Sequence, residues 1–260
     1  MSASATLHRI PPRIRAWPAW LLLSQLAVAL LWWRLGWAWG LPALLLSHAL
    51  FVVPVFLPRA GLYAGPALAR LPAVERAVWL TIDDGPSADT PAILDALDRH
   101  GARATFFLVG ERARAWPGLV AEIRRRGHGI GNHSQTHPSA RFWALGPRAM
   151  AAEVGGAQAA LTGPAGEPPR WFRSVAGHTN PFLAAPLREH GLARVAWSAR
   201  GYDAVDGDPV RVLQRIGRGL QPGAIVLLHE GAGHGRSVEI VEATLCLLDE
   251  RGLATLEPPQ

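Results

Sequence analysis

The pattern of apolar and polar positions divides the chain into two unlike regions. From residue 17 to residue 57 the chain is almost wholly apolar, with interruptions at Arg34 and Pro42. A helix needs about 20 residues to cross the hydrocarbon core of a bilayer, so this stretch is too long for one span. The pattern predicts two short transmembrane helices, at about 17–36 and 41–57, joined by a turn over the residues between them. A cleaved signal peptide fits less well, because the stretch is too long and no small-residue cleavage site follows it.

From Ala77 onward, short apolar runs rich in β-forming residues alternate with stretches that carry helical start and stop signals. Seven strands are predicted, at about 77–82, 104–109, 128–132, 170–173, 193–197, 224–228 and 253–256. Helices are predicted between them, at about 90–100, 117–126, 147–161, 181–190, 209–220 and 237–251. The predicted fold class is therefore α/β. Helical crossovers imply a parallel sheet, either rolled into a barrel or open.

A short segment between the two regions is rich in residues that interrupt helices and strands. Residues 58–76 contain five glycines and prolines, and this composition predicts a linker. We therefore divide the chain into an N-terminal membrane segment at 1–57, the linker at 58–76, and an α/β domain at 77–260.

The charged residues are distributed unevenly. All 26 basic residues are arginine, against 20 acidic residues, and the formal net charge is +6. Residues 1–57 hold four arginines and no acidic residue, so most of the excess lies in the membrane segment. The remainder has no basic stripe with interleaved aromatic residues, so no nucleic-acid partner is expected. The single cysteine, Cys246, excludes an intramolecular disulfide framework.

The arginines that flank the apolar segment bear on its orientation. Arg9, Arg13 and Arg15 precede it, and Arg59, Arg70 and Arg76 follow it. Because cytoplasmic loops carry an excess of basic residues, this distribution favours a hairpin with both ends in the cytoplasm. A single tilted span with a re-entrant piece would instead export the α/β domain. We expect a bacterial-type inner membrane as the location, with the α/β domain on its cytoplasmic side.

Two adjacent carboxylates stand where the first predicted core strand ends. The run Ala77–Ile82 is followed by Asp83 and Asp84, and then by Gly85-Pro86. Neighbouring residues on a strand point to opposite faces, so the two carboxylates are expected to have different roles. Taken alone, an Asp-Gly-Pro sequence is equally typical of a turn.

Further polar residues follow the other predicted strands. They are Asn132, His133 and His137 after the third strand, Arg173 and His178 after the fourth, Asp203 after the fifth, and His229 and Glu230 after the sixth. In a parallel barrel the carboxyl ends of all strands meet on one face, where the active site is built. Residues far apart in the sequence are therefore expected to converge on one site.

The histidines His133 and His137 are four residues apart. On a helical turn this spacing places both imidazoles on one side, where they can share a cation. With one carboxylate they form a site with open positions, which suits Zn²⁺ or another divalent transition metal. Two histidines at this spacing are also common by chance, so this prediction depends on the carboxylates nearby.

Four motifs occur in order along the second region. They are Thr81–Pro86, His133–His137, Arg173 with Gly177, and Leu227–His229. Together they resemble the motifs of the polysaccharide deacetylases of carbohydrate esterase family 4, which share the chitooligosaccharide deacetylase homology domain. The resemblance covers about residues 77–257. It implies a distorted (β/α)7-type barrel and metal-dependent hydrolysis of an N-acyl group on a sugar.

The resemblance also implies a role for each residue of these motifs. By position, Asp83 is the general base, Arg173 orients this base, and His229 is the general acid. The implied ligands of one divalent metal ion, which we expect to be Zn²⁺, are Asp84, His133 and His137.

The chemistry of amide hydrolysis agrees with these roles. An open-sided metal polarises the carbonyl and activates water, and Asp83 beside it would take the proton of that water. An amine leaves readily only when it is protonated, which is the expected task of His229. Asp203 is expected to hold His229 protonated through a charge pair that raises its pKa.

Two positions depart from the pattern of the family. Members usually carry a tyrosine immediately before Gly177, where this chain has Ala176, which can still supply a backbone N–H. The aspartate-rich motif after the fifth strand here runs from Trp197 to Asp203, with Arg200 in place of a carboxylate. This arginine is expected to weaken a charge relay to His229, and it indicates an anionic group near the site.

Two functions from different classes fit these observations. The first is a membrane-attached hydrolase of carbon–nitrogen bonds other than peptide bonds, which removes an acetyl or formyl group from an amino sugar. Its partners would be a soluble glycan or a lipid-linked saccharide, and the membrane through residues 17–57. The second is a catalytically silent member of the same fold that binds glycan. Silent relatives usually lack a metal ligand or the base, and this chain has both, which favours the enzyme.

Overall fold

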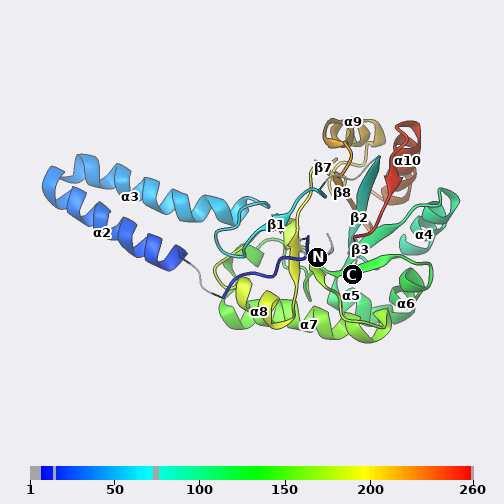
Figure 1. The fold of residues 1–260 in the computed structure, drawn as a ribbon, viewed down its shortest axis with the longest axis horizontal. Coiled ribbons are helices and arrows are strands. Elements are labelled where there is room, and N and C mark those ends of the chain that lie inside the picture. The colour runs from blue at the N-terminus through cyan, green and yellow to red at the C-terminus, as the bar shows by residue number, and fades with distance from the viewer. Residues whose placement is uncertain (1–6, 14–15, 73–75, 259–260) are drawn as a thin grey trace.

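The computed structural model describes residues 7–13, 16–72 and 76–258. Two long helices extend away from a curled sheet, and the remaining helices cover the outside of this sheet (Figure 1).

The two extending helices are α2 (Trp17–Leu35) and α3 (Trp37–Val52), which lie side by side, and a short 3₁₀ helix, η1 (Val53–Phe56), continues α3. Most of their large apolar side chains are exposed, and both spans are long and apolar enough to cross a membrane. Gln25 Nε2 donates a hydrogen bond of 2.8 Å to Ser47 Oγ, which links the two helices. Two helices in this region are thus confirmed, and their location in a membrane stays a prediction.

The turn between these helices lies at Gly36, before the position that the sequence indicated. Gly36 has a φ of 76°, a conformation that favours glycine, and α3 begins at the next residue. Gly40, which we expected in the turn, lies inside α3, where an added Cβ would collide with the ring of Trp32. This glycine therefore serves the close approach of the two helices rather than the reversal of the chain.

The sheet has nine strands in the described part of the chain, in the order β1-β6-β5-β4-β3-β2-β8-β7, with β9 paired to β2. All of these pairs are parallel. The strands are β1 (Ala67–Leu68), β2 (Ala77–Gly85), β3 (Ala104–Leu108), β4 (Gly129–Asn132), β5 (Trp171–Phe172), β6 (Ala193–Val195), β7 (Ala199–Arg200), β8 (Ile225–His229) and β9 (Ala254–Thr255). The predicted α/β class with a parallel sheet is confirmed. The two strands that the sequence did not indicate, β1 and β7, have only two residues each.

The helices of this region mostly lie where the sequence placed them. They are α4 (Thr90–Arg99), α5 (Gly110–Ala115), α6 (Pro117–Arg125), α7 (Pro147–Ala165), α8 (Ala184–Glu189), α9 (Pro209–Gly219) and α10 (Ser237–Glu250), with 3₁₀ helices η2 (Phe142–Ala144) and η3 (Val175–Gly177). Helix α8 is shorter than predicted, and α5 was not predicted.

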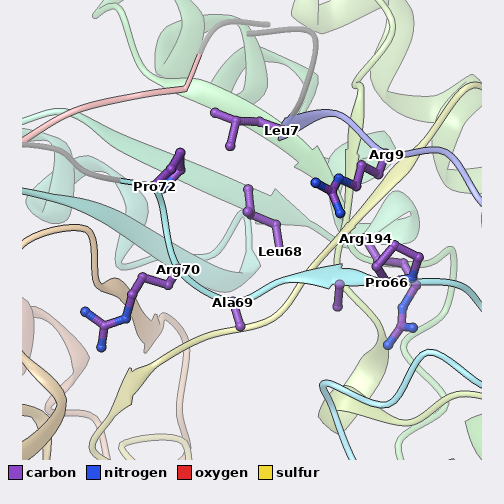
Figure 2. A pocket seen from close by; sticks show the side chains of 9 residues that line it. Leu7, Arg9, Pro66, Leu68, Ala69, Arg70, Pro72 and Arg194 are labelled. Carbon is purple, nitrogen blue, oxygen red and sulfur yellow. The ribbon is translucent and has the colours of Figure 1, made fainter. Parts of the chain in front are cut away.

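The sheet curls into a distorted barrel, and the segment before β2 bridges its open side. Strand β6 lies near one end of the sheet and β7 at the other, yet only residues 196–198 separate them along the chain. Ala67 pairs with Arg194 of β6, and Leu71 N donates to Gly223 O, just before β8. This segment lines a cavity of about 370 Å³. Figure 2 shows the side chains around it. Residues 67–71 thus pair with the sheet, although they fall inside the predicted linker. The division of the chain into a membrane segment, a linker and an α/β domain stays a prediction.

The alternation of side chains along β2 decides which residues face the barrel interior. Alternate residues of Val78–Ile82 belong to the core between the sheet and the outer helices. Trp79 instead packs with Phe107 and Trp171 in a separate inner cluster. Asp83 has the same parity as Trp79, so it faces the interior at the carboxyl end of the strand.

Candidate active site

The first pair of polar residues comes from neighbouring strands. Strands β2 and β8 pair so that Asp83 lies opposite His229, and both residues line one cavity. Simple alternation would point Asp84 to the outer face, but the register of β2 shifts between Asp83 and Gly85, and Asp84 has a φ of 71°. A bulge re-aims side chains in this way. The expectation that the two carboxylates face opposite sides is therefore wrong, since Asp84 lines the same cavity.

The two histidines lie on a loop, not on the helical turn that their spacing suggested. The loop follows β4, and Ser134 and His137 in it have φ values of 69° and 53°. Ser134 Oγ accepts a hydrogen bond from the backbone N–H of His137. The ring centroids of His133 and His137 are 4.9 Å apart, so the loop itself brings the imidazoles together.

One carboxylate joins the two histidines in a cluster that could hold a metal ion. Asp84 Oδ1 lies 3.3 Å from His133 Nε2 and 3.0 Å from His137 Nε2, and the three potential ligand atoms lie within 4.8 Å of one another. Burial opposes the charge of Asp84, yet the two adjacent imidazoles hold the pKa of this carboxylate below the usual range. An ionised carboxylate with two imidazole nitrogens is a donor set typical of Zn²⁺.

The position of His133 in this cluster is fixed from its other nitrogen. His133 Nδ1 lies 2.8 Å from the backbone oxygen of Arg173, a contact in which the ring donates its Nδ1–H. Nε2 is then left with its lone pair directed at the cluster. Metal-binding histidines are commonly oriented by such a partner, so the residues present fit a divalent cation.

The other carboxylate, Asp83, has a different partner. Arg173 Nη1 donates to Asp83 Oδ1 at 2.7 Å and to Thr81 Oγ1 at 2.7 Å. The Arg173 side chain is fully buried, and this burial lowers the pKa of its guanidinium, although Asp83 opposes the shift. Asp83 Oδ2 faces the cluster instead, 3.6 Å from His133 Nε2. Asp83 is therefore held in place on one side and free to act on the other.

His229 and Asp203 form an ion pair at the same cavity. His229 Nδ1 lies 3.1 Å from Asp203 Oδ1, and the backbone N–H of His229 donates to Asp203 Oδ2. Burial opposes protonation of the imidazole, but the charge of Asp203 and this hydrogen bond raise the pKa of His229 to about 9. The structure thus brings Asp203 to His229 even though Arg200 stands nearby in the chain.

One cavity of about 300 Å³ is lined by Asp83, Asp84, His133, His137 and His229. Arg173 and Asp203 do not line it, but each contacts one of these residues. The walls of the cavity also include Ala176, which has a φ of 51°, together with Trp197 and Arg200. The structure thus brings together all seven residues that the sequence singled out for catalysis or metal binding.

Two buried glutamates support the site, and the sequence analysis gave neither of them a role. Glu153 on α7 accepts hydrogen bonds from the backbone N–H groups of Gln135 and Thr136, which orders the histidine loop. Glu230 accepts hydrogen bonds from the hydroxyls of Ser87 and Thr90, and burial raises its pKa to about 7. The sequence could have indicated Glu230, because it directly follows His229. It gave no indication of Glu153, because the contact of Glu153 with the histidine loop depends on how α7 packs.

Comparison with known proteins agrees with this geometry. A family model described as Polysaccharide deacetylase matches residues 71–195. The chain is 34% identical over 185 residues to a chitooligosaccharide deacetylase of Bradyrhizobium sp., covering 70% of this chain and 84% of the relative. It is 32% identical over 193 residues to the peptidoglycan-N-acetylglucosamine deacetylase PgdA of Listeria monocytogenes, but the match spans only 40% of that longer protein.

Solved structures show the same fold. A family 4 carbohydrate esterase from Streptomyces lividans, in complex with acetate, superposes with a TM-score of 0.64 at 32% identity, covering 71% of this chain and 94% of that one. The Bc1960 peptidoglycan N-acetylglucosamine deacetylase gives a TM-score of 0.67 at 28% identity, covering 73% and 89%. A family 4 pseudoenzyme from Bacillus anthracis gives a TM-score of 0.64 at 25% identity, covering 72% of this chain and 65% of that one.

Proposed function

Because this chain belongs to the polysaccharide deacetylase family, we propose that it removes an acetyl or formyl group from an amino sugar with one bound Zn²⁺ ion. It is a hydrolase of carbon–nitrogen bonds other than peptide bonds. Its substrate is an amino sugar within a glycan or a lipid-linked saccharide.

One observation carries this proposal. Asp83, which is bonded to Arg173, and His229, which is paired with Asp203, line the same cavity as the cluster of Asp84 with His133 and His137. A base, an acid and a set of metal ligands are therefore available at one place. Amide hydrolysis needs these three functions together.

The proton transfers can be assigned to side chains of the chain itself. When bound, the metal ion polarises the amide carbonyl and lowers the pKa of a water molecule. Asp83 takes a proton from this water through Oδ2, while Arg173 holds Oδ1. Arg173 also donates to Thr81 and to the Ala196 carbonyl oxygen, which fixes the guanidinium and hence the carboxylate.

Departure of the amine requires a second proton transfer. His229 carries a proton at neutral pH because Asp203 raises its pKa to about 9. The protonated imidazole donates this proton to the sugar nitrogen as the carbon–nitrogen bond breaks, and the products are a free amino sugar and a carboxylic acid.

A measurement of metal content and amine release tests the proposal. The full chain, purified in detergent, is expected to hold about one zinc per chain and to release amine from an N-acetylated chitooligosaccharide. A chelator should abolish this release, and added Zn²⁺ should restore it. A chain that binds the oligosaccharide and zinc but never releases amine would instead support the silent, glycan-binding alternative.

The acid role of His229 predicts a pH dependence. A group with a raised pKa is protonated below that pKa and loses its proton above it, so turnover should fall as the pH rises through about 9. Asp203→Asn removes the charge that raises the pKa, and the alkaline limb of kcat should move toward the ordinary histidine value of about 6.5. The measurement is kcat from pH 5 to pH 10; an unchanged alkaline limb in Asp203→Asn would exclude His229 as the titrating acid.

The contacts of the N-terminal residues support a hairpin topology. His8, which precedes α2, lies against Trp171 with ring centroids 5.2 Å apart, and Arg188 Nη1 donates to the Pro12 carbonyl oxygen. After α3, the backbone N–H of Thr179 donates to Val55 O. Both ends of the helix pair therefore contact the catalytic domain, as a hairpin requires. A single span would place the two ends on opposite sides of the bilayer.

The proposed orientation has the domain in the cytoplasm, because arginines flank both ends of the hairpin. A fluorescent protein fused after Gln260 should therefore fluoresce, and alkaline phosphatase at the same place should be inactive. A fusion that is active as a phosphatase would place the domain outside the membrane and overturn this orientation.

A further inference from the structure

The catalytic cavity contains one arginine that has no partner for its charge. Arg200 ends β7 and lines this cavity, and its guanidinium makes no hydrogen bond or ion pair with the residues that the structure describes. Its Nε is buried from solvent without an acceptor. A buried donor of a charged group without an acceptor costs free energy, so this arrangement calls for an explanation.

The carboxylates around the cavity already have partners. Asp83 is paired with Arg173, Asp203 is paired with His229, and Asp84 belongs to the metal cluster. No carboxylate of the described chain is therefore left to neutralise Arg200 at this cavity. The surplus positive charge is available to a group that enters from outside.

Aromatic rings hold the guanidinium in a defined plane. Its central carbon lies 3.8 Å from the ring centroid of Tyr202 and 5.2 Å from that of Trp197. Stacking of this kind leaves the edges of a guanidinium free to donate in the plane, which matches the paired oxygens of a phosphate or a carboxylate. The side chain is thus oriented in advance for an oxyanion.

The cavity also lies next to the point where the chain leaves the apolar helices. Gly177 lines the cavity, and a Cβ added there would lie 2.6 Å from Pro58, just beyond η1. Phe56 of η1 packs against His178 with ring centroids 5.2 Å apart. The end of the proposed membrane hairpin is therefore docked on the rim of the cavity, and a substrate held in the bilayer would meet the site without crossing the domain.

We propose that Arg200 binds an oxyanion carried by the substrate next to its amino sugar, and that this oxyanion is the phosphate of a lipid-linked saccharide. This inference rests on the proposed function, because it names the substrate class of the same site. A soluble sugar phosphate presents the same chemistry, and the experiment separates the two sources.

Three substrates with the same sugar test the proposal on the full chain in detergent. They are methyl N-acetylglucosaminide, N-acetylglucosamine 1-phosphate, and N-acetylglucosamine joined through a phosphodiester to a short isoprenyl chain. The wild type should have its highest kcat/KM on the third. Arg200→Gln should reduce the preference for the charged substrates over the neutral one by about 10- to 100-fold, chiefly through KM, because a charge-assisted hydrogen bond is lost. Arg200→Lys keeps the charge but not the planar edge, and should give an intermediate preference.

A matched control is available on the next helix. Arg211 on α9 is exposed and paired with Asp206 and Asp208, so Arg211→Gln makes the same change of charge outside the cavity. This variant should keep the wild-type preference. Melting temperatures of all variants show whether Arg200→Gln disturbs the fold. If it does, the substrate preference of Arg200→Lys is used in its place to test the role of Arg200.

The outcomes separate the role of Arg200, the source of the oxyanion and the deacylase activity. An equal loss on all three substrates in Arg200→Gln, or no loss, would overturn the role of Arg200 while leaving the deacylase in place. Equal wild-type rates on the two charged substrates would overturn the lipid source and keep the oxyanion. If the wild type hydrolyses none of them but releases amine from the N-acetylated chitooligosaccharide, the proposed function stands and the inference is overturned. If it hydrolyses neither these substrates nor the chitooligosaccharide, the proposed function fails, and calorimetric binding of N-acetylglucosamine 1-phosphate decides: binding that Arg200→Gln removes supports the oxyanion role of Arg200, and no binding overturns it.

Discussion

Replacement of Asp83 by asparagine is expected to reduce kcat by at least about 100-fold while metal stays bound, since a general base contributes about 10²–10⁴-fold. The amide oxygen of asparagine can still accept the hydrogen bond that Arg173 Nη1 gives to Asp83 Oδ1 at 2.7 Å. The side chain therefore keeps its place, but it cannot take a proton from water. Amine release and metal content, measured on one preparation, report the two properties separately.

The adjacent carboxylate supplies the matched control. Asp84→Asn removes a proposed ligand, so it should lose metal and activity together, whereas Asp83→Asn should lose activity alone. Comparable loss of metal in both variants would mean that both carboxylates are ligands or that their roles are exchanged. Arg173 is fully buried, so removal of the charge of Asp83 should also lower the melting temperature.

The position of Asp83 was predictable from the sequence because this residue stands where a recognisable buried strand ends. The apolar run before it is short and ends at Gly-Pro, and this predicted β2. Parallel strands then place Asp83 opposite His229 on the neighbouring strand, and Arg173 at the end of β5. Convergence of distant residues on one face needs only the direction of the strands, which helical crossovers determine.

The details that the sequence did not predict depend on contacts between distant elements. Asp84 faces the cavity because β2 bulges at this point, a local conformation that no residue spacing encodes. The histidine loop is ordered by Glu153, whose contribution depends on the packing of α7. Likewise, β1 is two residues long and exists through its pairing with β6. Spacing alone therefore predicted that His133 and His137 lie close together, but not the loop that achieves it.

The presence of Arg200 close to Asp203 in the sequence led to a wrong expectation about the contact between Asp203 and His229. The arginine in this motif suggested a weakened link between Asp203 and His229, yet the carboxylate contacts both the ring and the backbone of His229. The reason is positional: Arg200 ends β7, while Asp203 lies three residues further, beyond a turn in which Tyr202 has a φ of 64°. The two side chains thus reach different partners.

Replacement of His133 by alanine is expected to lower metal affinity by more than about 100-fold and to remove activity with it. The loss of an outer partner of a ligand alone costs about 10–100-fold in affinity, and here the ligand itself is removed. His133 is also the more buried of the two histidines, with Nε2 at 3.3 Å from Asp84 Oδ1 and Nδ1 at 2.8 Å from the Arg173 carbonyl oxygen. Water cannot reproduce both contacts of a side chain that is only 3% exposed.

The measurement is zinc content after dialysis against a weak chelator, together with amine release. His100→Ala serves as the control, because His100 pairs with Asp249 and Glu242 outside the catalytic cavity, and this variant should keep both metal and activity. Partial recovery of His133→Ala at high zinc concentration would show that the fold survives and that affinity is what was lost. Full zinc occupancy in His133→Ala, with or without activity, would show that the ion is held elsewhere and that Asp84, His133 and His137 do not form its site.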